Sequence, residues 1–248
     1  ARTTAEAVAM QQAAEAAAAR GVRSMLAPPA PFYTGRRYIT HLVQSGYLGQ
    51  LRHVMAFHMN AAFADPATPL SAGRTGPGMY GQFNSNQLGL TYDVLLPWTG
   101  PVRRVLAEHA QFVAQRPATP DGPLADMPYP DLMNVLAETE SGAVAMSCHS
   151  WGTRFADTRI ELYGSEGTVV YHLRGDVLEG ARVGDAGLQR LTIPPEHDGT
   201  WRIEEEFVAL VRGEVAEPSF TFADGVRNMA YLEAAYRSAT EGGWVAVG

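Results

Sequence analysis

The feature that most constrains the fold is a run of short, alternating apolar and polar segments from about residue 102 to residue 193. Turns that contain glycine separate these segments, for example Ser141-Gly142 and Gly164-Ser165-Glu166-Gly167. Glycine takes a positive φ without a Cβ clash, so such turns suit tight hairpins. Connections this short cannot cross over to a parallel neighbour, and the pattern predicts six to eight strands in a mainly antiparallel sheet.

Helices are expected on both sides of this run. Thr3 followed by Glu6 is a capping-box pattern before an alanine-rich stretch that ends at Gly21, which predicts a helix over 4–20. Apolar spacing predicts further helices at 39–45, from about Asn86, at 201–212 and at about 222–240. Strands are predicted at 22–27 and 51–59. The chain is therefore expected to belong to the α+β class, with an open, mostly antiparallel sheet.

Charge and composition argue against several kinds of partner. The chain has a formal net charge of -7 and scattered arginines, so we expect no nucleic-acid surface. No apolar run approaches the roughly 18 residues that a membrane-spanning helix needs, so we expect a soluble, cytoplasmic protein without a membrane partner. The spacing of the 7 histidines gives no metal-binding motif, and we expect no metal. The single cysteine, Cys148, is expected to be a small buried apolar residue.

All 19 basic residues are arginines. Arginine stays protonated, so these 248 residues exclude mechanisms that need a lysine of their own, such as a Schiff base or a lysine proton donor.

The stretch "GPGMYG", residues 76–81, has the letters of a dinucleotide-binding fingerprint. That fingerprint works only between a buried strand and a helix, where the pyrophosphate reaches the helix N-terminus. Here the preceding residues, "PLSAGRT", are typical of a loop, and Pro77 lies inside the motif. We therefore interpret it as a loop that leads into a helix.

A histidine near the end of a predicted strand is a candidate for ligand binding. His149 lies in "SCHSWGTRF", close to Trp151 and Arg154. These three side chains could line a pocket for a polar or anionic ligand. The alternation in "AVAMSCHSW" is equally compatible with His149 as an ordinary residue of a strand face.

Four stretches, taken together and in order, resemble the Gfo/Idh/MocA family of nicotinamide-dependent oxidoreductases. They are "TTAEAVAMQQAAEAAAARGV", "RRYITHLVQSGYLGQLRHV", "RIELYGSEGTVV" and "FTFADGVRNMAYLEAAYRSATEGGWVAV". The resemblance implies that residues 1–28 are the C-terminal remnant of a dinucleotide-binding domain, whose main part would precede Ala1. It also implies that residues 29–248 are a substrate-binding and oligomerisation domain with helices on one face of the sheet. The other face is then expected to pair with a second copy in a homodimer or tetramer.

The same resemblance locates the expected active site. The family typically carries the pattern D-x-x-x-H-x-x-D on the helix after the long loop, with the histidine exchanging a proton beside the substrate. Over "NQLGLTYD", Asn86 takes the place of the first Asp, Leu90 that of the His and Asp93 that of the last Asp. Leucine cannot exchange a proton, so another group must do so if catalysis is retained.

Two sets of candidate residues follow from this comparison. Tyr80, Tyr92 and His149 are candidates for proton transfer, and Asn86, Leu90, Trp151 and Arg154 are candidates for substrate binding.

The resemblance leaves three hypotheses. The first is an NAD- or NADP-dependent oxidoreductase of a sugar, polyol or related hydroxy or keto compound, with an altered site. The second is an inactive family member that serves as a binding or structural subunit, and the third is glycoside cleavage by a transient hydride shift. Because the phosphate-binding βαβ unit is expected to lie outside these residues, this chain alone is expected to bind no nicotinamide nucleotide.

Overall fold

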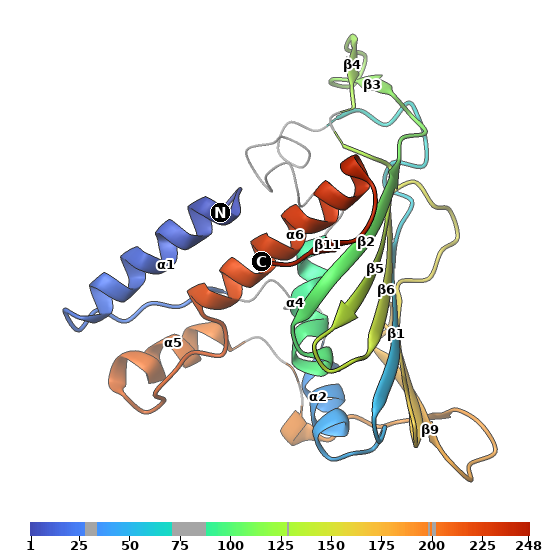
Figure 1. Ribbon diagram of the computed structural model, residues 1–248. Helices are drawn as coiled ribbons and strands as arrows, with labels where there is room; N and C mark the ends of the chain where they lie inside the picture. The colour runs from blue at the N-terminus through green and yellow to red at the C-terminus, as the bar shows by residue number, and fades with distance from the viewer. Residues whose placement is uncertain (28–33, 71–87, 128, 198, 200–201) are drawn as a thin grey trace.

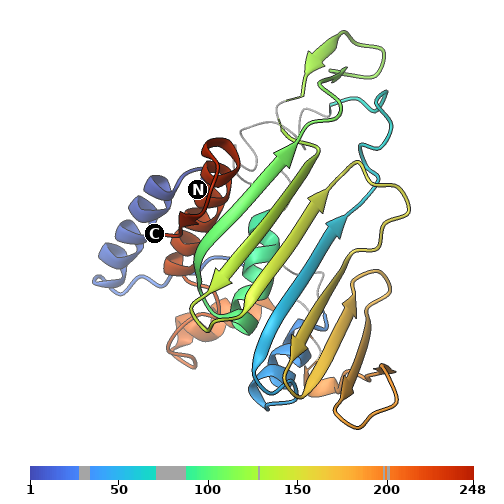
Figure 2. The same cartoon turned by 45° about the vertical axis from the view of Figure 1, so that its right-hand side comes forward.

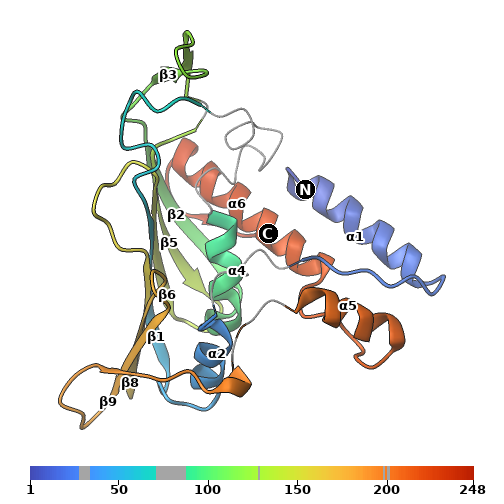
Figure 3. The ribbon, with the colours of Figure 1, turned by 180° about the vertical axis from the view of Figure 1, so that it is seen from behind.

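The computed structural model describes residues 1–27, 34–70, 88–127, 129–197, 199 and 202–248. Helices pack on one face of a large sheet, and in the described residues the opposite face carries no helix (Figures 1 and 3). The predicted α+β class, with an open and mostly antiparallel sheet, is confirmed. Residues 28–33 are not among those described, so the domain boundary at residue 28 stays a prediction.

The sheet has nine strands in the described part of the chain. They are β1 (Leu51–Met59), β2 (Val102–Ala110), β5 (Leu132–Thr139), β6 (Val144–Ser150), β7 (Arg159–Gly164), β8 (Gly167–His172), β9 (Val177–Arg182), β10 (Gln189–Arg190) and β11 (Val245–Ala246). Their order is β10-β9-β8-β7-β1-β6-β5-β2-β11, and Figure 2 shows the long strands side by side.

One strand pair departs from the antiparallel pattern. β1 runs parallel to β6, while the other neighbours in the sheet pair antiparallel. The two strands therefore end at the same edge of the sheet, with His58 in register with His149. The strand predicted at 51–59 is confirmed, but its parallel partner was not foreseen.

The prediction of six to eight strands between residues 102 and 193 was too low. Nine strands, β2 to β10, lie in this part of the described chain. They include a separate hairpin of β3 (Gln115–Pro117) and β4 (Leu124–Asp126). Strands of two or three residues are too short to show a periodic pattern, which is why the sequence did not reveal them.

Gly164 marks a close approach between the β7–β8 hairpin and the turn before β1. A Cβ added at Gly164 would lie 1.9 Å from the carbonyl oxygen of Leu48. Only glycine leaves room for this backbone contact. The first glycine of "YGSEG", Gly164, is therefore needed for this backbone contact.

Three helices cover the sheet: α2 (Arg36–Gln44), α4 (Leu88–Thr99) and α6 (Phe222–Glu241). The predicted helices at these places are confirmed, and α6 begins with a capping box between Thr221 and Asp224. Leu232 and Ala235 of α6 are fully buried against the sheet layer. None of the described helices is both long and apolar enough to cross a bilayer.

The N-terminal helix α1 (Thr4–Ala18) lies along α6 (Figure 1). The Thr3 side chain caps it by accepting from the Glu6 N–H, but the Glu6 carboxylate accepts from the Arg2 N–H, so the capping box is only half formed. Ala7 is its only buried residue.

The strand predicted at 22–27 is wrong. In that segment the Leu26 N–H donates to the Phe220 carbonyl oxygen, and the residues belong to no strand. A strand exists only where a neighbouring strand completes its ladder, and this segment has none among the described residues.

Helix α5 (Ile203–Arg212) forms at the place predicted for a helix at 201–212, but much of its apolar side is exposed. Leu210 is buried, but Phe207 is 40% exposed and Val211 is 57% exposed. The helix forms where the apolar spacing predicted it, because that spacing sets local structure. Burial of its apolar side also needs a neighbouring surface, which the described residues do not supply.

Arg116 in β3 connects the β3–β4 hairpin to the segment after β1 and to Asp131, next to the start of β5. Its guanidinium is fully buried and donates to the carbonyl oxygens of Phe63 and Asp65. It also lies 3.7 Å from the carboxylate of Asp131, which is itself 5% exposed. The Asp131 carboxylate accepts from the N–H groups of Phe112 and Val113, so this ion pair joins three segments at one end of the sheet.

Candidate functional site

Helix α4 carries the part of the family pattern that the structure describes. It contains a single charged residue, Asp93, and all but three of its residues are buried, because it lies between the sheet and the other helices. Leu90, in the first turn, is half-buried and packs against the main core. Two candidate residues, Tyr80 and Asn86, lie outside the described residues, as does the stretch "GPGMYG".

A row of side chains on β6 faces α4. Ala145 and Ser147 contact the same small cavity as Thr99, Leu95 and Tyr92 of α4. The turn before β6 contacts the last turn of α4, where the Ser141 hydroxyl donates to the Thr99 carbonyl oxygen, so β6 begins near the C-terminal end of this helix. His149 is the next residue of the row on the same strand face, so it lies on the helix-covered side towards the α4 N-terminus.

His58 of β1 is the neighbour of His149 on this face. The two imidazole rings are nearly parallel, with centroids 6.3 Å apart and an angle of 18° between the planes. His149 is fully buried. Burial lowers the pKa of His58 to about 4, because desolvation disfavours the charged imidazolium. At neutral pH His58 is therefore an uncharged imidazole.

His58 was not among the candidate residues predicted from the sequence. Strand alternation puts His58 on the same face of β1 as Val54 and Ala56, which are buried. This alternation was the only feature of the sequence that could have indicated a buried histidine here. The contact with His149 depends on the parallel pairing of β1 and β6, which local sequence does not encode.

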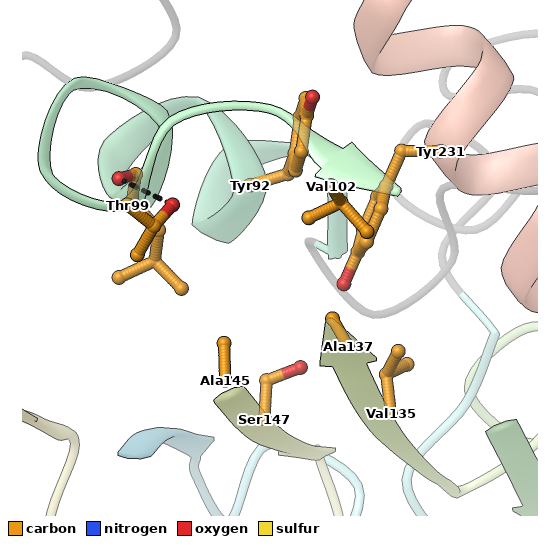
Figure 4. Close-up of a pocket in the computed structure, with 9 residues that line it drawn as sticks. Tyr92, Thr99, Val102, Val135, Ala137, Ala145, Ser147 and Tyr231 are labelled. Atoms are coloured by element: carbon orange, nitrogen blue, oxygen red, sulfur yellow. Dashed lines mark hydrogen bonds between the residues drawn. The ribbon is translucent and has the colours of Figure 1, made fainter. Parts of the chain in front are cut away.

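Tyr92 points into the core. Its ring stacks on Tyr231 of α6, with centroids 4.3 Å apart, above a small cavity (Figure 4). The cavity offers ≈ 10 Å³, about the room that a single water molecule needs, so it is too small for a sugar. Burial raises the pKa of Tyr92 to about 12, which makes this phenol a poor proton donor or acceptor at neutral pH.

Trp151 and Arg154 lie in the loop after β6, which bulges on the side of the sheet away from the helices (Figure 1). The Trp151 ring stacks on Phe63, with centroids 5.6 Å apart. The exposed Arg154 donates to the carbonyl oxygen of Ala64. The structure thus joins these two residues to the segment after β1, whereas His149 faces the helices.

Asp93, the remaining residue of the family pattern, is buried between helices. Its carboxylate accepts a 2.6 Å hydrogen bond from Asn228 of α6. Burial raises the pKa of Asp93 to about 7, although the bond from Asn228 and the nearby Arg36 favour the charged form. Neither Asn228 nor Arg36 was singled out from the sequence, since both come from other helices.

Cys148 differs from its expected burial. It is half-buried on the sheet face opposite His149, with its Sγ 3.8 Å from the Sδ of Met59. Burial nevertheless raises the pKa of its thiol, so the reactive thiolate is disfavoured at neutral pH.

The described residues give little support for a bound cofactor or metal. No group of three or more histidine, cysteine or acidic side chains in the described ranges has a metal-binding arrangement. Within the same ranges no short glycine-rich turn leads from a strand into a helix, which is the arrangement that binds a pyrophosphate.

The described residues form an open, mostly antiparallel sheet with helices on one face, which is a mixed α+β architecture. The sequence model described as GFO/IDH/MocA C-terminal domain matches residues 37–170. The chain belongs to the Gfo/Idh/MocA family, through this C-terminal domain.

Solved structures agree on the fold. The chain is similar to an oxidoreductase domain protein from Kribbella flavida, with 25% identity, a TM-score of 0.88, and coverage of 100% of this chain and 72% of that one. It is also similar to levoglucosan dehydrogenase in its apo form, with 22% identity, a TM-score of 0.84, and coverage of 100% and 72%. An NAD binding oxidoreductase from Klebsiella pneumoniae gives 21% identity, a TM-score of 0.77, and the same coverage. The comparison with curated proteins gave no match.

Proposed function

We propose that this chain is the substrate-binding and oligomerisation part of an NAD- or NADP-dependent oxidoreductase of a sugar, polyol or related hydroxy or keto compound. The proposal is carried by the match to the family's C-terminal domain, together with two stacked histidines. His58 and His149 lie on the sheet face that is covered by helices, which include α4, the helix that contains Leu90. Levoglucosan dehydrogenase, one of the proteins with the same fold, has been crystallised with NADH and with levoglucosan.

His149 is the group that best fits proton exchange in place of Leu90. It lies on the helix-covered face of β6, and an imidazole suits acid–base chemistry near neutral pH. In this proposal the His149 imidazole would accept the proton of the substrate hydroxyl, and the nicotinamide cofactor of the complete enzyme would supply the hydride acceptor.

The test uses the full-length protein with NAD or NADP and a panel of sugars, polyols and their keto forms. His149→Asn is expected to lower kcat by about 100-fold or more, since positioned general bases contribute roughly 10² to 10⁴. The matched control is His109→Asn, an exposed histidine of β2, which should leave kcat unchanged. Equal activity of the His149 variant and wild type would overturn the role of His149.

The alternative is an inactive family member that binds a ligand or supports an assembly. The specific observation in its favour is Leu90 at the proton-transfer position. No turnover with any member of the panel, together with saturable binding of one of them, would support it. Leu90→His alone is not expected to create activity, because catalytic groups act as a set.

We also propose that the open sheet face joins two copies of the chain. Strand alternation puts Met55, Phe57, Met146 and Leu136 on this face, and all are half-buried apolar side chains. A surface of this kind suits a symmetric dimer or a dimer of dimers.

The oligomeric state provides a separate test. Light scattering of the full-length protein at micromolar concentration is expected to give a dimer or tetramer, and Met146→Glu is expected to shift it towards monomer, because a charge in a packed apolar interface is costly. Val183→Glu, at a valine that is 78% exposed beyond the sheet face, is the matched control. A monomeric wild-type protein would exclude this arrangement.

A further inference from the structure

A polar cluster occupies the contact between α4 and α6, in an otherwise apolar layer. The side-chain amide of Asn228 in α6 donates two hydrogen bonds to α4. One goes to the carbonyl oxygen of Gly89 at 2.9 Å, and the other to the Asp93 carboxylate at 2.6 Å. Asn228 has two N–H donors on this nitrogen, so the two bonds use both of them.

The two acceptors lie on either side of Leu90 in the first turns of α4. Residues 89 and 93 are four positions apart, so they lie one above the other on a single face of the helix. A donor that holds both fixes the rotation of this end of α4 about its axis. The direction in which position 90 points is then fixed as well, because it follows Gly89 by one residue.

Burial makes this cluster sensitive to protonation. Asp93 is 5% exposed, and desolvation raises its pKa to about 7. The groups that act on it come from two other helices: Arg36 of α2 and Asn228 of α6 favour the carboxylate, and Asp224 of α6 disfavours it. Tyr92 of α4 is a further titratable neighbour.

We infer that Asn228 and Asp93 form a clamp that positions the first turn of α4. Ionisation of Asp93 strengthens its bond from Asn228 but leaves a charge in a buried place, and because this desolvation is the larger effect, the turn opens more readily when Asp93 is ionised. The inference rests on the proposed function only in taking position 90 to face the substrate. Asn228 and Asp93 are positioning residues, since they act through the helix.

The sign of the pH effect follows from linkage. When the first turn is closed, the pKa of Asp93 is about 7, and when it opens to water the pKa returns towards 3.8. The closed form therefore loses stability as the pH rises from about 4 to 7, and the loss stays constant above pH 7. Opening is thus expected to be more frequent at pH 8 than at pH 5.

The experiment is amide hydrogen exchange of the full-length protein, with rates corrected for intrinsic pH dependence. In the wild type, exchange of the first turns of α4 is expected to be at least about tenfold faster at pH 8 than at pH 5. Asp93→Asn keeps an acceptor for Asn228 but cannot ionise, so this pH dependence should disappear while protection at pH 5 remains.

Asn228→Ala removes both bonds and should speed exchange of the first turns about tenfold or more at either pH, the scale of a buried hydrogen bond. Thr240→Ala is the control, because its hydroxyl also bonds within α6, to the Tyr236 carbonyl oxygen, without touching α4. The clamp is overturned if Asn228→Ala behaves like Thr240→Ala, or if exchange rises equally at Thr99 in the last turn. The pH-dependent part is overturned if the wild type and Asp93→Asn share one pH profile.

This measurement needs no substrate. If the full-length protein shows no oxidoreductase activity, the proposed function fails while the exchange result still decides the clamp. If activity is found, Asn228→Ala is expected to lower kcat more than it changes KM, since it displaces position 90 without removing a binding group.

Discussion

Arg116→Met is expected to lower the free energy of unfolding by about 3 to 5 kcal/mol, the range found when one partner of a buried ion pair is removed. The guanidinium has no exposed surface, and the carboxylate of Asp131 is 5% exposed. Without Arg116 that carboxylate would stay buried with only the N–H groups of Phe112 and Val113, and two loop carbonyl groups would lose their donor. Urea unfolding of wild type and variant measures the difference.

The control for this change is Arg103→Met. Arg103 also pairs with a carboxylate, Glu138, but its side chain is 65% exposed. Removal of an exposed pair is expected to cost less than about 1 kcal/mol. If the two variants lose the same stability, the ion pair at Arg116 does not hold the β3–β4 hairpin as the structure indicates.

The second large effect is expected at low pH, from His58. Its folded-state pKa is about 4 against an ordinary value of 6.5, so the folded protein disfavours the charged imidazolium. Its contribution to stability is complete above pH 6.5 and is lost as the pH falls towards 4. About 2.5 pH units at 1.36 kcal/mol each give a loss of roughly 3 kcal/mol.

Asp93 changes stability in the opposite sense over nearly the same range, because its folded-state pKa is raised to about 7. Its penalty is largest above pH 7 and disappears as the pH falls to about 4. The wild-type profile therefore contains two opposing contributions, and a comparison of variants is needed to separate them.

His58→Phe isolates the histidine contribution. Relative to wild type, this variant should gain about 3 kcal/mol in free energy of unfolding at pH 4 compared with pH 7, because phenylalanine does not titrate. Denaturant unfolding at pH 4, 5.5 and 7 measures the difference, with His109→Phe, at an exposed histidine of β2, as the control. A constant difference between wild type and His58→Phe across this range would contradict the burial assigned to His58.

The candidate site was only partly predictable. Asp93 was identified from the family pattern and His149 from its strand-end position, and both are buried next to helices. Trp151 and Arg154 were expected beside His149, yet the chain turns after β6 and packs them on the segment 60–65. A one-dimensional pattern shows which residues are near in sequence, but the direction of a loop depends on what it packs against.

The apolar pattern of helices such as α5 shows the same limit. Its spacing predicted the helix correctly, because backbone hydrogen bonds and side-chain spacing act within one turn. Phe207 and Val211 on its apolar side are nevertheless exposed among the described residues, because burial depends on the surface that a neighbouring element provides.

By itself the sequence determined the local elements of this protein: the alternating strands, their glycine turns and the main helices. These follow from interactions between residues a few positions apart. Only the tertiary structure decided that β1 pairs in parallel with β6, which brings His58 beside His149, and that α6 brings Asn228 to Asp93, 135 positions away. Such contacts form because burying the apolar layer offsets the entropy of closing long loops, and that balance belongs to the whole chain.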